Sequence, residues 1–267
     1  MKVAVISDIH ANPEALENAL ADAKAQGCQQ IVCLGDIVGY GYDPGACIDI
    51  IKDNNIKCCL GNHDAGLIGK LSLEWFSETA KYGIMWQRGK TTDAQKDFLR
   101  SLPYAITEEF NGKKVVFAHG TMYLPEKFYY IQDAVDARYE MASMGKECDY
   151  LFVGHTHCAE AYGIDHKEGF FIFGLYNAPD LSIKLTNYRH IIANVGSVGY
   201  PRVQRKSHYI IYDTNEHKIS FRTLAFNFYH YVSNMENHSV KIPMWLKSYM
   251  EPDANPTQKE TEKPRED

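Results

Sequence analysis

The sequence predicts an α/β fold built on two sheets, and three features support this prediction. In the first 60 residues, short apolar runs alternate with amphipathic helical segments, which is typical of βαβ units and a parallel sheet. Beyond residue 158, short strand-like segments follow one another and favour a second, more antiparallel sheet. The chain of 267 residues is long enough for a large core, and it shows neither an internal repeat nor a domain linker.

The first part of the chain carries three predicted strands and two predicted helices. The strands are short apolar runs at residues 3–6, 31–34 and 56–60. The first helix spans residues 12–26, where Asn12 can cap the start, Pro13 takes the first helical position and Gly27 closes the end. The second helix spans residues 43–54 and turns isoleucines inward at helical spacing.

The middle of the chain continues the alternation of helices and strands. A helical pattern rich in large side chains runs over residues 72–102 and breaks around Gly89. A hairpin turn at Asn111-Gly112 joins two predicted strands, and a further helix is predicted at residues 128–145. The strands of this region are predicted at residues 104–110, 113–118 and 150–153.

The last part of the chain predicts the second sheet, two short helices and a tail. Its strands are predicted at residues 159–164, 169–174, 181–186, 190–195, 208–212 and 218–223. The helices are predicted near residues 228–235 and 243–250. The acidic tail at 251–267 has no aromatic or large aliphatic residue, so we expect it to be disordered and the folded domain to span residues 1–250.

Composition and charge exclude several classes of function. With 28 basic and 34 acidic residues the net charge is −6, so no basic excess attracts duplex nucleic acid or an anionic membrane. No apolar stretch is long enough for a transmembrane helix, and the amino terminus lacks a signal-peptide pattern. The seven cysteines include no CxxC pair, which indicates free thiols in a reducing compartment rather than disulfides. We therefore expect a cytoplasmic protein of undetermined oligomeric state.

Polar motifs stand where five of the predicted strands end. They are Asp8-Ile9-His10, Gly35-Asp36, Gly61-Asn62-His63-Asp64, His119-Gly120 and Gly154-His155-Thr156-His157. Ligands of open α/β sheets bind at the carboxyl ends of the strands, so these segments should deliver their side chains to one edge. The glycines at positions 35, 39, 61 and 154 are expected to serve tight backbone turns rather than to hold phosphate.

The side chains of these motifs suit a catalytic metal site. Carboxylates, imidazoles and an amide without any thiolate favour Mn²⁺, Fe, Zn²⁺, Co²⁺ or Ni²⁺ over a structural zinc. Asp8 and His10 are two residues apart, as are His155 and His157, so each pair leaves an extended backbone on one side. A central carboxylate such as Asp36 can bridge two cations ~3.5–4 Å apart, the arrangement of two-metal hydrolases.

Together the motifs resemble those of the calcineurin-like metallophosphoesterases. The family motif DxH corresponds to residues 8–10, GDxxG to 35–39, GNHD to 61–64, and GHTH to 154–157, with the lone histidine at His119. The block at residues 194–199 is similar to the compact bacterial branch of phosphodiesterases and dinucleoside polyphosphatases. The resemblance runs from residue 1 to about 250 and implies an α/β/β/α sandwich with a dinuclear site, in which Mn²⁺ is the first choice.

The resemblance also implies a role for each matching residue. The first cation would be held by Asp8, His10, Asp36 and His157. The second would be held by Asp36, Asn62, His119 and His155. His63 would face the phosphate and protonate or stabilise the leaving oxygen, and Asp64 would orient the His63 ring. Asn62 and His63 are expected to contact the substrate, and Tyr40, close to Asp36 in sequence, to line the mouth of the site.

The expected substrate is small and phosphorylated. A phosphodiester and a dinucleoside polyphosphate are the leading candidates, and a phosphomonoester or phosphoprotein is the alternative. The segment GDIVGYG lacks the arginine that protein Ser/Thr phosphatases and symmetrical diadenosine tetraphosphatases carry after GD, which disfavours that branch; Arg202 is a possible substitute cation. Aromatic residues after Asp36 and His119 could stack a nucleobase, although core packing is the more common role. A catalytically silent scaffold, as in a retromer subunit, is the non-enzyme alternative.

Overall fold

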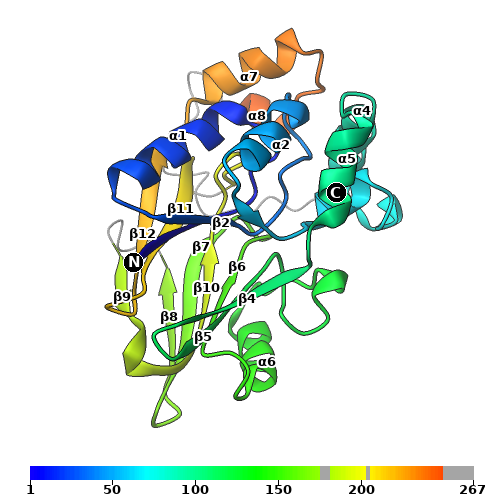
Figure 1. The fold of residues 1–267 in the computed structure, drawn as a ribbon. Helices are drawn as coiled ribbons and strands as arrows, with labels where there is room; N and C mark the ends of the chain where they lie inside the picture. The colour runs from blue at the N-terminus through cyan, green and yellow to red at the C-terminus, as the bar shows by residue number, and fades with distance from the viewer. Residues whose placement is uncertain (175–180, 203–204, 249–267) are drawn as a thin grey trace.

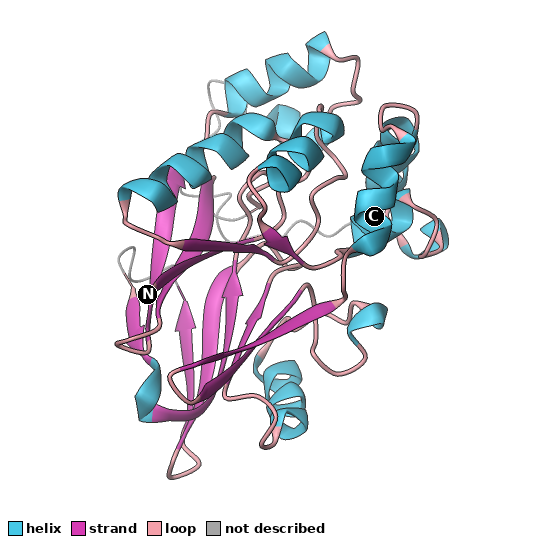
Figure 2. Cartoon of the chain, viewed as in Figure 1, coloured by secondary structure: helices cyan, strands magenta, loops and turns pink. Residues whose placement is uncertain are grey.

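Two six-stranded sheets pack face to face between helices (Figures 1 and 2). The computed structural model describes residues 1–174, 181–202 and 205–248. The predicted α/β/β/α sandwich is therefore confirmed. The tail predicted at 251–267 lies outside the described residues, so the extent of the domain stays a prediction.

The first sheet combines the parallel amino-terminal strands with antiparallel strands from late in the chain. Its order is β3 (Lys57–Cys58), β2 (Gln30–Cys33), β1 (Lys2–Ile6), β11 (Lys206–Asp213), β12 (Lys218–Ala225) and β9 (Ser182–Lys184). β1 and β3 pair with β2 in parallel, whereas β11 pairs with β1 in antiparallel register, Ala4 opposite Ile211. β12 and β9 extend the antiparallel half.

The second sheet is also mixed. Its order is β4 (Ala105–Phe110), β5 (Lys113–Ala118), β6 (Tyr150–Val153), β10 (Tyr188–Val195), β7 (Ala159–Asp165) and β8 (Phe170–Gly174). The neighbours β5, β6 and β10 run parallel, so their carboxyl ends meet at one edge. β4, β7 and β8 pair with their neighbours in antiparallel register.

The division of strands between the sheets differs from the prediction. We expected the strands after residue 158 to form the second sheet by themselves. Instead β7, β8 and β10 join β4, β5 and β6, while β9, β11 and β12 complete the first sheet. Strands buried on both faces, such as β1 and β10, carry apolar residues at consecutive positions, so their sequences do not specify a partner strand.

Helices cover the outer faces of both sheets. α1 (Pro13–Ala25) and α2 (Pro44–Asp53) place Leu16 and Ile48 against Ala4 and Ile6 of β1 on the first sheet. α6 (Ala134–Met144) packs on the outer face of the second sheet, where Met141 meets strand residues of β5 and β6. Val3 and Val5 point the other way, between the sheets, as the alternation of side chains along a strand requires.

Five further α-helices are present in the described part of the chain. They are α3 (Asn62–Leu67), α4 (Glu78–Arg88), α5 (Asp93–Ser101), α7 (Phe228–Asn237) and α8 (Met244–Ser248). The predicted pattern at 72–102 therefore divides into a 3₁₀ turn at Leu73–Trp75 and two helices, because a capping box at Thr92 starts a new helix. α6 begins after Asp133 rather than at 128, since Phe128 has φ 53°.

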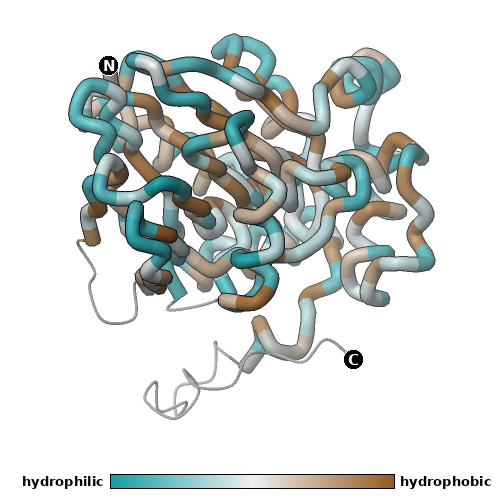
Figure 3. Tube along the Cα trace, turned by 90° about the horizontal axis from the view of Figure 1, so that it is seen from below, coloured by the Kyte–Doolittle hydropathy of each residue, from teal (hydrophilic) through white to brown (hydrophobic). Residues whose placement is uncertain are grey.

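Two further observations concern the nature of the chain. In the described part of the chain, no helix is long and apolar enough to cross a membrane. All seven cysteines are free thiols. In the hydropathy view, hydrophobic and hydrophilic segments alternate along the chain (Figure 3).

Candidate metal centre

The loops after β1, β2, β5 and β6, together with the start of α3, bring the predicted site residues together. All of them are buried: Asp8, His10, Asp36, Tyr40, Asn62, His63, Asp64, His119, His155 and His157. Backbone hydrogen bonds hold neighbouring loops in register, from His10 N to Asp36 O at 2.9 Å and from Gly154 N to His119 O at 3.0 Å. The two sheets meet where the N–H of His155 donates to Asp8 Oδ2 at 3.0 Å.

These loops turn sharply at the site residues themselves. Five of the predicted ligands have left-handed φ angles, which non-glycine residues adopt rarely and at a cost: Asp8 54°, His10 48°, Asp36 52°, His155 70° and His157 61°. The motif glycines allow the loops to approach each other. A Cβ on Gly61 would lie 2.2 Å from Asp36 N, and one on Gly154 would lie 2.1 Å from Ser7 Oγ. These two glycines therefore serve the close approach of neighbouring loops, whereas we expected them to serve tight backbone turns.

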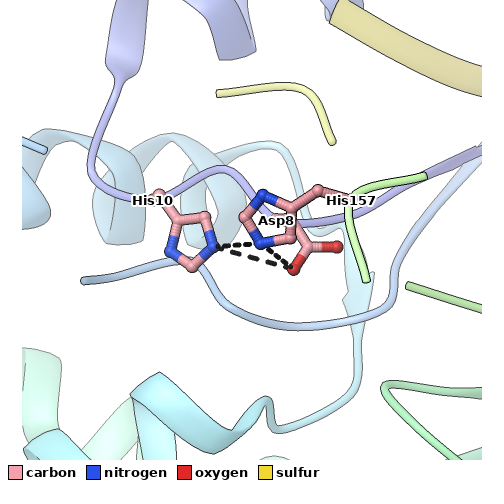
Figure 4. Close-up of side chains that lie close together, drawn as sticks. All are labelled: Asp8, His10 and His157. Atoms are coloured by element: carbon pink, nitrogen blue, oxygen red, sulfur yellow. Dashed lines mark hydrogen bonds and ion pairs between the residues drawn. The ribbon is translucent and has the colours of Figure 1, made fainter. Parts of the chain in front are cut away.

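The first group of donors consists of Asp8, His10 and His157 (Figure 4). The Nε2 atoms of His10 and His157 lie 3.1 Å apart. Asp8 Oδ1 lies 3.3 Å from His157 Nε2 and 3.7 Å from His10 Nε2. That oxygen is buried and has no hydrogen-bond partner.

The backbone determines which nitrogen of each ring in this group is protonated. His10 Nδ1 lies 3.0 Å from Val38 O, and His157 Nδ1 lies 2.6 Å from Tyr200 O. A carbonyl only accepts, so both Nδ1 atoms carry the hydrogen and both Nε2 atoms present lone pairs. Two lone pairs 3.1 Å apart fit donors to one cation, because ligands ~2.1 Å from an ion lie about 3 Å from each other. The residues present therefore fit a metal.

The second group consists of Asp36, His119 and His155, with Asn62 beside them. His119 Nε2 lies 3.0 Å from Asn62 Oδ1, 3.2 Å from His155 Nδ1 and 3.3 Å from Asp36 Oδ2. His155 donates from Nε2 to Phe128 O at 3.0 Å, which leaves its Nδ1 lone pair directed to His119. This set again combines oxygen and nitrogen donors around one point.

Asp36 faces both groups. Its Oδ2 lies 3.3 Å from His119 Nε2 and 3.7 Å from His10 Nε2. Its other oxygen, Oδ1, accepts from the N–H of His63 at 2.8 Å, which orients the carboxylate. A single carboxylate oxygen thus lies between the two sets of imidazoles.

His63 lies beside both groups, and packing rather than a hydrogen bond holds its ring. Its Nε2 is 4.0 Å from Asp36 Oδ2, and its buried Nδ1 has no hydrogen-bond partner. Tyr40 and Phe76 contact the ring, with centroids 4.7 and 5.2 Å away. Its atoms also fall within a possible donor group with His10 and Asp36.

Asp64 has partners other than the predicted one. We expected its carboxylate to orient the His63 ring. Instead Oδ1 accepts from Val38 N at 3.1 Å, and Oδ2 accepts from Gly61 N at 3.0 Å at the start of α3. Asp64 therefore joins the loop after β2 to the helix that carries Asn62 and His63, and acts on His63 only through the backbone.

Aromatic rings line the site, and some of the contacts were not apparent from the sequence. Tyr40 stacks on Tyr200 at 4.2 Å and 2°, and meets His10 edge-on at 4.8 Å. Tyr130 stacks on His155 at 3.7 Å and 9°. Tyr200 and the carbonyls that orient the imidazoles escaped sequence reasoning, because a carbonyl is common to every residue and Tyr200 is not part of any motif.

Two polar residues, one near the end of β10 and one just after this strand, support the ligand loops. Asn194 Nδ2 donates to Gly154 O at 2.6 Å and to Thr156 Oγ1 at 2.9 Å, next to the two histidines of that loop. Ser197 Oγ donates to Asp8 O at 2.8 Å. Both side chains therefore fasten the end of β10 to the site.

Burial and mutual proximity shift the pKa values of the site. Burial lowers the pKa of His63 to about 3, against the opposing charge of Asp36. Burial and then the charge of Arg202 lower the pKa of His157 to about 4. Burial would raise the pKa of Asp36, but His119 and His63 hold it below its usual value. Burial would lower the pKa of His119, but Asp36 raises it to about 9. Metal binding requires ionised carboxylates and unprotonated imidazole nitrogens.

Burial also acts on Asp64. Burial and the nearby charge of Asp36 raise its pKa to about 7, while the two backbone N–H bonds oppose that shift. The two N–H donors require acceptors, so they favour the ionised carboxylate.

Comparison with known proteins matches residues 1–217 to a family model, the calcineurin-like phosphoesterase superfamily domain. An uncharacterized protein from Methanocaldococcus jannaschii is 36% identical over 246 residues, which cover 91% of this chain and 95% of that protein. The crystal structure of a metallophosphoesterase from Sphaerobacter thermophilus is 28% identical, with a TM-score of 0.75 and coverage of 93% of this chain and 97% of that one. A hypothetical protein from Pyrococcus horikoshii shares the fold at 19% identity, a TM-score of 0.70 and the same coverage.

Proposed function

Because the chain belongs to the calcineurin-like phosphoesterase superfamily and is a phosphoester hydrolase of that superfamily, we propose that it uses two cations to hydrolyse a phosphodiester or a dinucleoside polyphosphate. The position of Asp36 carries the proposal. Its Oδ2 lies within 3.7 Å of His10 Nε2 in one donor group and 3.3 Å of His119 Nε2 in the other. A carboxylate between two sets of donors is the bridging ligand that a two-metal site needs.

The assignment of ligands follows the two donor groups. The first cation would be held by Asp8, His10, Asp36 and His157, and the second by Asp36, Asn62, His119 and His155. Bound there, two divalent cations would neutralise the phosphate oxygens and make hydroxide available near neutral pH. We propose Mn²⁺, with Fe, Zn²⁺, Co²⁺ and Ni²⁺ as alternatives that the same nitrogen and oxygen donors accept.

The chain's own groups handle the phosphate and the leaving oxygen. Asn62 and Tyr40 lie beside the donor groups, where they can position the phosphate. The oxygen of water forms a bond to phosphorus and the water releases one proton to solvent, while the bond to the leaving oxygen breaks and its electron pair stays on the leaving oxygen. His63 protonates or stabilises this oxygen, and Asp64 holds the segment that carries His63 through its bonds to Val38 and Gly61.

The setting of the enzyme belongs to the same proposal. The free cysteines support a cytoplasmic location, because thiols stay reduced there. The substrate is small and phosphorylated, with a nucleotide as the favoured kind. Phosphomonoesterase or protein phosphatase activity is the enzymatic alternative, and a silent scaffold the other.

The test is to strip the protein of metal, reload it with Mn²⁺ and assay three substrates: bis-p-nitrophenyl phosphate, p-nitrophenyl phosphate and diadenosine tetraphosphate. We expect turnover of the diester or the tetraphosphate in preference to the monoester. Asp36→Asn should lose both metals and turnover. His63→Ala should keep two metals and lose turnover by about 10²–10⁴-fold, the usual contribution of a proton-transferring group.

His166→Ala serves as the matched control, because His166 is an exposed imidazole at the turn between β7 and β8, and it should behave like the wild type. Metal content is measured for every variant. Two bound metals with no turnover of any of the three substrates would contradict the proposal and favour the scaffold.

A further inference from the structure

The segment after β10 lies fastened across the loop that carries Asp8 and His10. Val198 N donates to Ser7 O at 3.0 Å, and Gly199 N donates to Asp8 O at 3.0 Å. A Cβ on Gly199 would lie 1.7 Å from Ile9 O, so the two backbones are in direct contact. The next residues along the chain, which include Arg202, therefore begin beside the loop of the first donor group.

The side chain of Arg202 reaches the aromatic shelf, by which we mean the stacked rings of Tyr40 and Tyr200. Arg202 Nη2 donates to Tyr40 Oη at 3.2 Å, and its Cζ lies 5.9 Å from the Tyr40 ring centroid. The guanidinium thus lies at the hydroxyl end of Tyr40. Tyr40 is itself held, because it is buried and its ring packs on His10 and His63 at 4.8 and 4.7 Å.

Tyr40 lies between Arg202 and the imidazoles of the site. The ring of Tyr40 contacts His10 and His63, whereas Arg202 contacts the hydroxyl at the far end of that ring. The guanidinium therefore lies past the hydroxyl of Tyr40, outside the two donor groups, and its charge also acts on His157 of the first group. In the proposed function, a group that reaches Arg202 is therefore one attached to the phosphate bound at the donor groups.

We propose that Arg202 binds a second phosphate attached to the scissile one, and so makes the enzyme selective for phosphoric anhydrides over simple diesters. This inference rests on the proposed function and names its substrate class. A guanidinium keeps its charge at every physiological pH, and its planar fork of N–H donors matches the oxygens of a phosphate. A neutral organic leaving group offers no such partner.

The reaction balances with water as the only co-reactant. The water oxygen bonds to the scissile phosphorus while the bond from that phosphorus to the bridging oxygen breaks. The electron pair of the broken bond stays on the bridging oxygen, which leaves as part of the second phosphate, and the attacking water releases one proton to solvent. Arg202 stabilises the negative charge that grows on that second phosphate.

The test compares two substrates in the Mn²⁺-loaded enzyme: diadenosine tetraphosphate, whose leaving group is a phosphate chain, and bis-p-nitrophenyl phosphate, whose leaving group is a phenol. Arg202→Ala should lower kcat/KM for the tetraphosphate about 10- to 100-fold, the range expected for charged hydrogen bonds, and for the diester less than about threefold. Added guanidinium ion should restore part of the loss with the tetraphosphate alone.

Two further variants guard the interpretation. Arg202→Gln keeps the aliphatic part of the side chain and a polar end without the charge, and it should reproduce the selective loss if Arg202→Ala folds poorly. Arg189→Ala removes an exposed arginine that pairs with Glu168, and the ratio of the two kcat/KM values should stay at the wild-type figure. Thermal unfolding and metal content accompany each assay.

An equal loss on both substrates would mean that Arg202 only supports Tyr40, and no loss on either would mean that it contacts neither leaving group; both outcomes overturn the inference. Turnover of the diester without turnover of the tetraphosphate by the wild type also overturns it and leaves the proposed function intact. Turnover of neither substrate with two metals bound contradicts the proposed function, and the inference with it.

Discussion

At the scale of the residue, single backbone carbonyls determine which nitrogen of each histidine ligand carries the hydrogen. Val38 O and Tyr200 O take the Nδ1 protons of His10 and His157, so the two Nε2 lone pairs face each other. Phe128 O does the same to Nε2 of His155. These hydrogen bonds fix the orientation of the three rings, which lowers the cost of ordering the ligands.

Gly39 is required because His63 occupies the space where a side chain would be. A Cβ there would lie 2.1 Å from His63 Nδ1, and the residue has φ 95°. We expect Gly39→Ala to displace the His63 ring and to lower kcat at least tenfold while both metals stay bound. Steady-state kinetics with metal analysis checks this.

The control for this prediction is Gly27→Ala, at a position with φ 76° and no heavy atom within 4 Å of an added Cβ. It carries the backbone strain without the collision, so it should lose about 1 kcal/mol of stability and no activity. Full activity in Gly39→Ala would contradict the argument.

His208 is a buried imidazole whose titration opposes folding in acid. Burial lowers its pKa to about 4, and its Nε2 has no hydrogen-bond partner. In the unfolded chain the same imidazole takes up a proton near pH 6.5. The free energy of unfolding is therefore not reduced by His208 above that pH, and it falls as the pH drops toward 4. His208→Phe should escape this loss, which amounts to about 3 kcal/mol.

Urea unfolding of wild type and His208→Phe at pH 7, 6, 5 and 4 measures the difference. The gap between their unfolding free energies should shift in favour of the variant across this range. The exposed His166→Phe serves as the comparison and should follow the wild type. Parallel pH curves for wild type and His208→Phe would rule out the titration.

At the scale of elements, one side of the site depends on two consecutive strands, β10 and β11, that belong to different sheets. β10 ends in the second sheet and β11 begins in the first, and residues 196–202 leave the end of β10 toward the first sheet. Their path passes the loop after β1, where Val198 and Gly199 bind Ser7 and Asp8. This crossing brings Arg202 to Tyr40, a contact between residues 162 positions apart in the chain.

A charged contact joins α1 to the antiparallel half of the first sheet. Asp22 on α1 accepts from Arg222 of β12 at 2.9 and 3.0 Å and from Tyr209 Oη of β11 at 2.6 Å. Burial would raise the pKa of Asp22, but the bonds from Arg222 and Tyr209 lower it. The Asp22 carboxylate therefore contributes its full stabilisation above its unfolded pKa, which is near 4. This stabilisation is lost as the pH falls through the lower pKa of the folded chain.

We expect Asp22→Asn to cost about 1 kcal/mol at pH 7, since the pair is partly exposed, and progressively less below pH 4. Chemical unfolding of both proteins at pH 7 and pH 3 measures it. Asp97→Asn is the control, because Asp97 pairs with Arg100 on one exposed turn of α5 and should change stability little at either pH. A deficit of equal size at both pH values would contradict the assigned role of Asp22.

At the scale of the whole molecule, the site joins the two sheets, so its occupancy should stabilise the entire fold. Asp8 and His10 follow a strand of the first sheet, whereas His119, His155 and His157 follow strands of the second. A cation between them cross-links both halves, and only the folded chain presents all its ligands. At 100 times the dissociation constant, bound metal adds about 2.7 kcal/mol.

We therefore expect chelation to lower Tm and Mn²⁺ to restore it. Asp36→Asn should largely lose this response, whereas Asp22→Asn, destabilised away from the site, should keep it. Differential scanning calorimetry with and without chelator measures both. An identical response to Mn²⁺ in wild type and Asp36→Asn would show that the metal binds elsewhere.

Local patterns in the sequence were sufficient to predict many of the elements. Asn12 caps α1 and Asp43 caps α2, each through a side-chain oxygen that accepts from the backbone N–H of the third helical residue. These caps involve only residues that are close together in the sequence, so the sequence alone predicts them. α3 was missed because it is only six residues long and starts within the motif Asn62-His63-Asp64, where the ligand residues conceal a helix start.

The sequence by itself determined the fold class, the first strands and helices, and which donor atoms can meet at the carboxyl ends of the strands. These follow from local periodicity and from the chemistry of side chains. Only the tertiary structure decided which strands share a sheet, that Asp64 binds backbone rather than His63, and that Arg202 reaches Tyr40. Such contacts join residues far apart in the chain. They depend on the packing of whole elements, which no single segment of the sequence specifies.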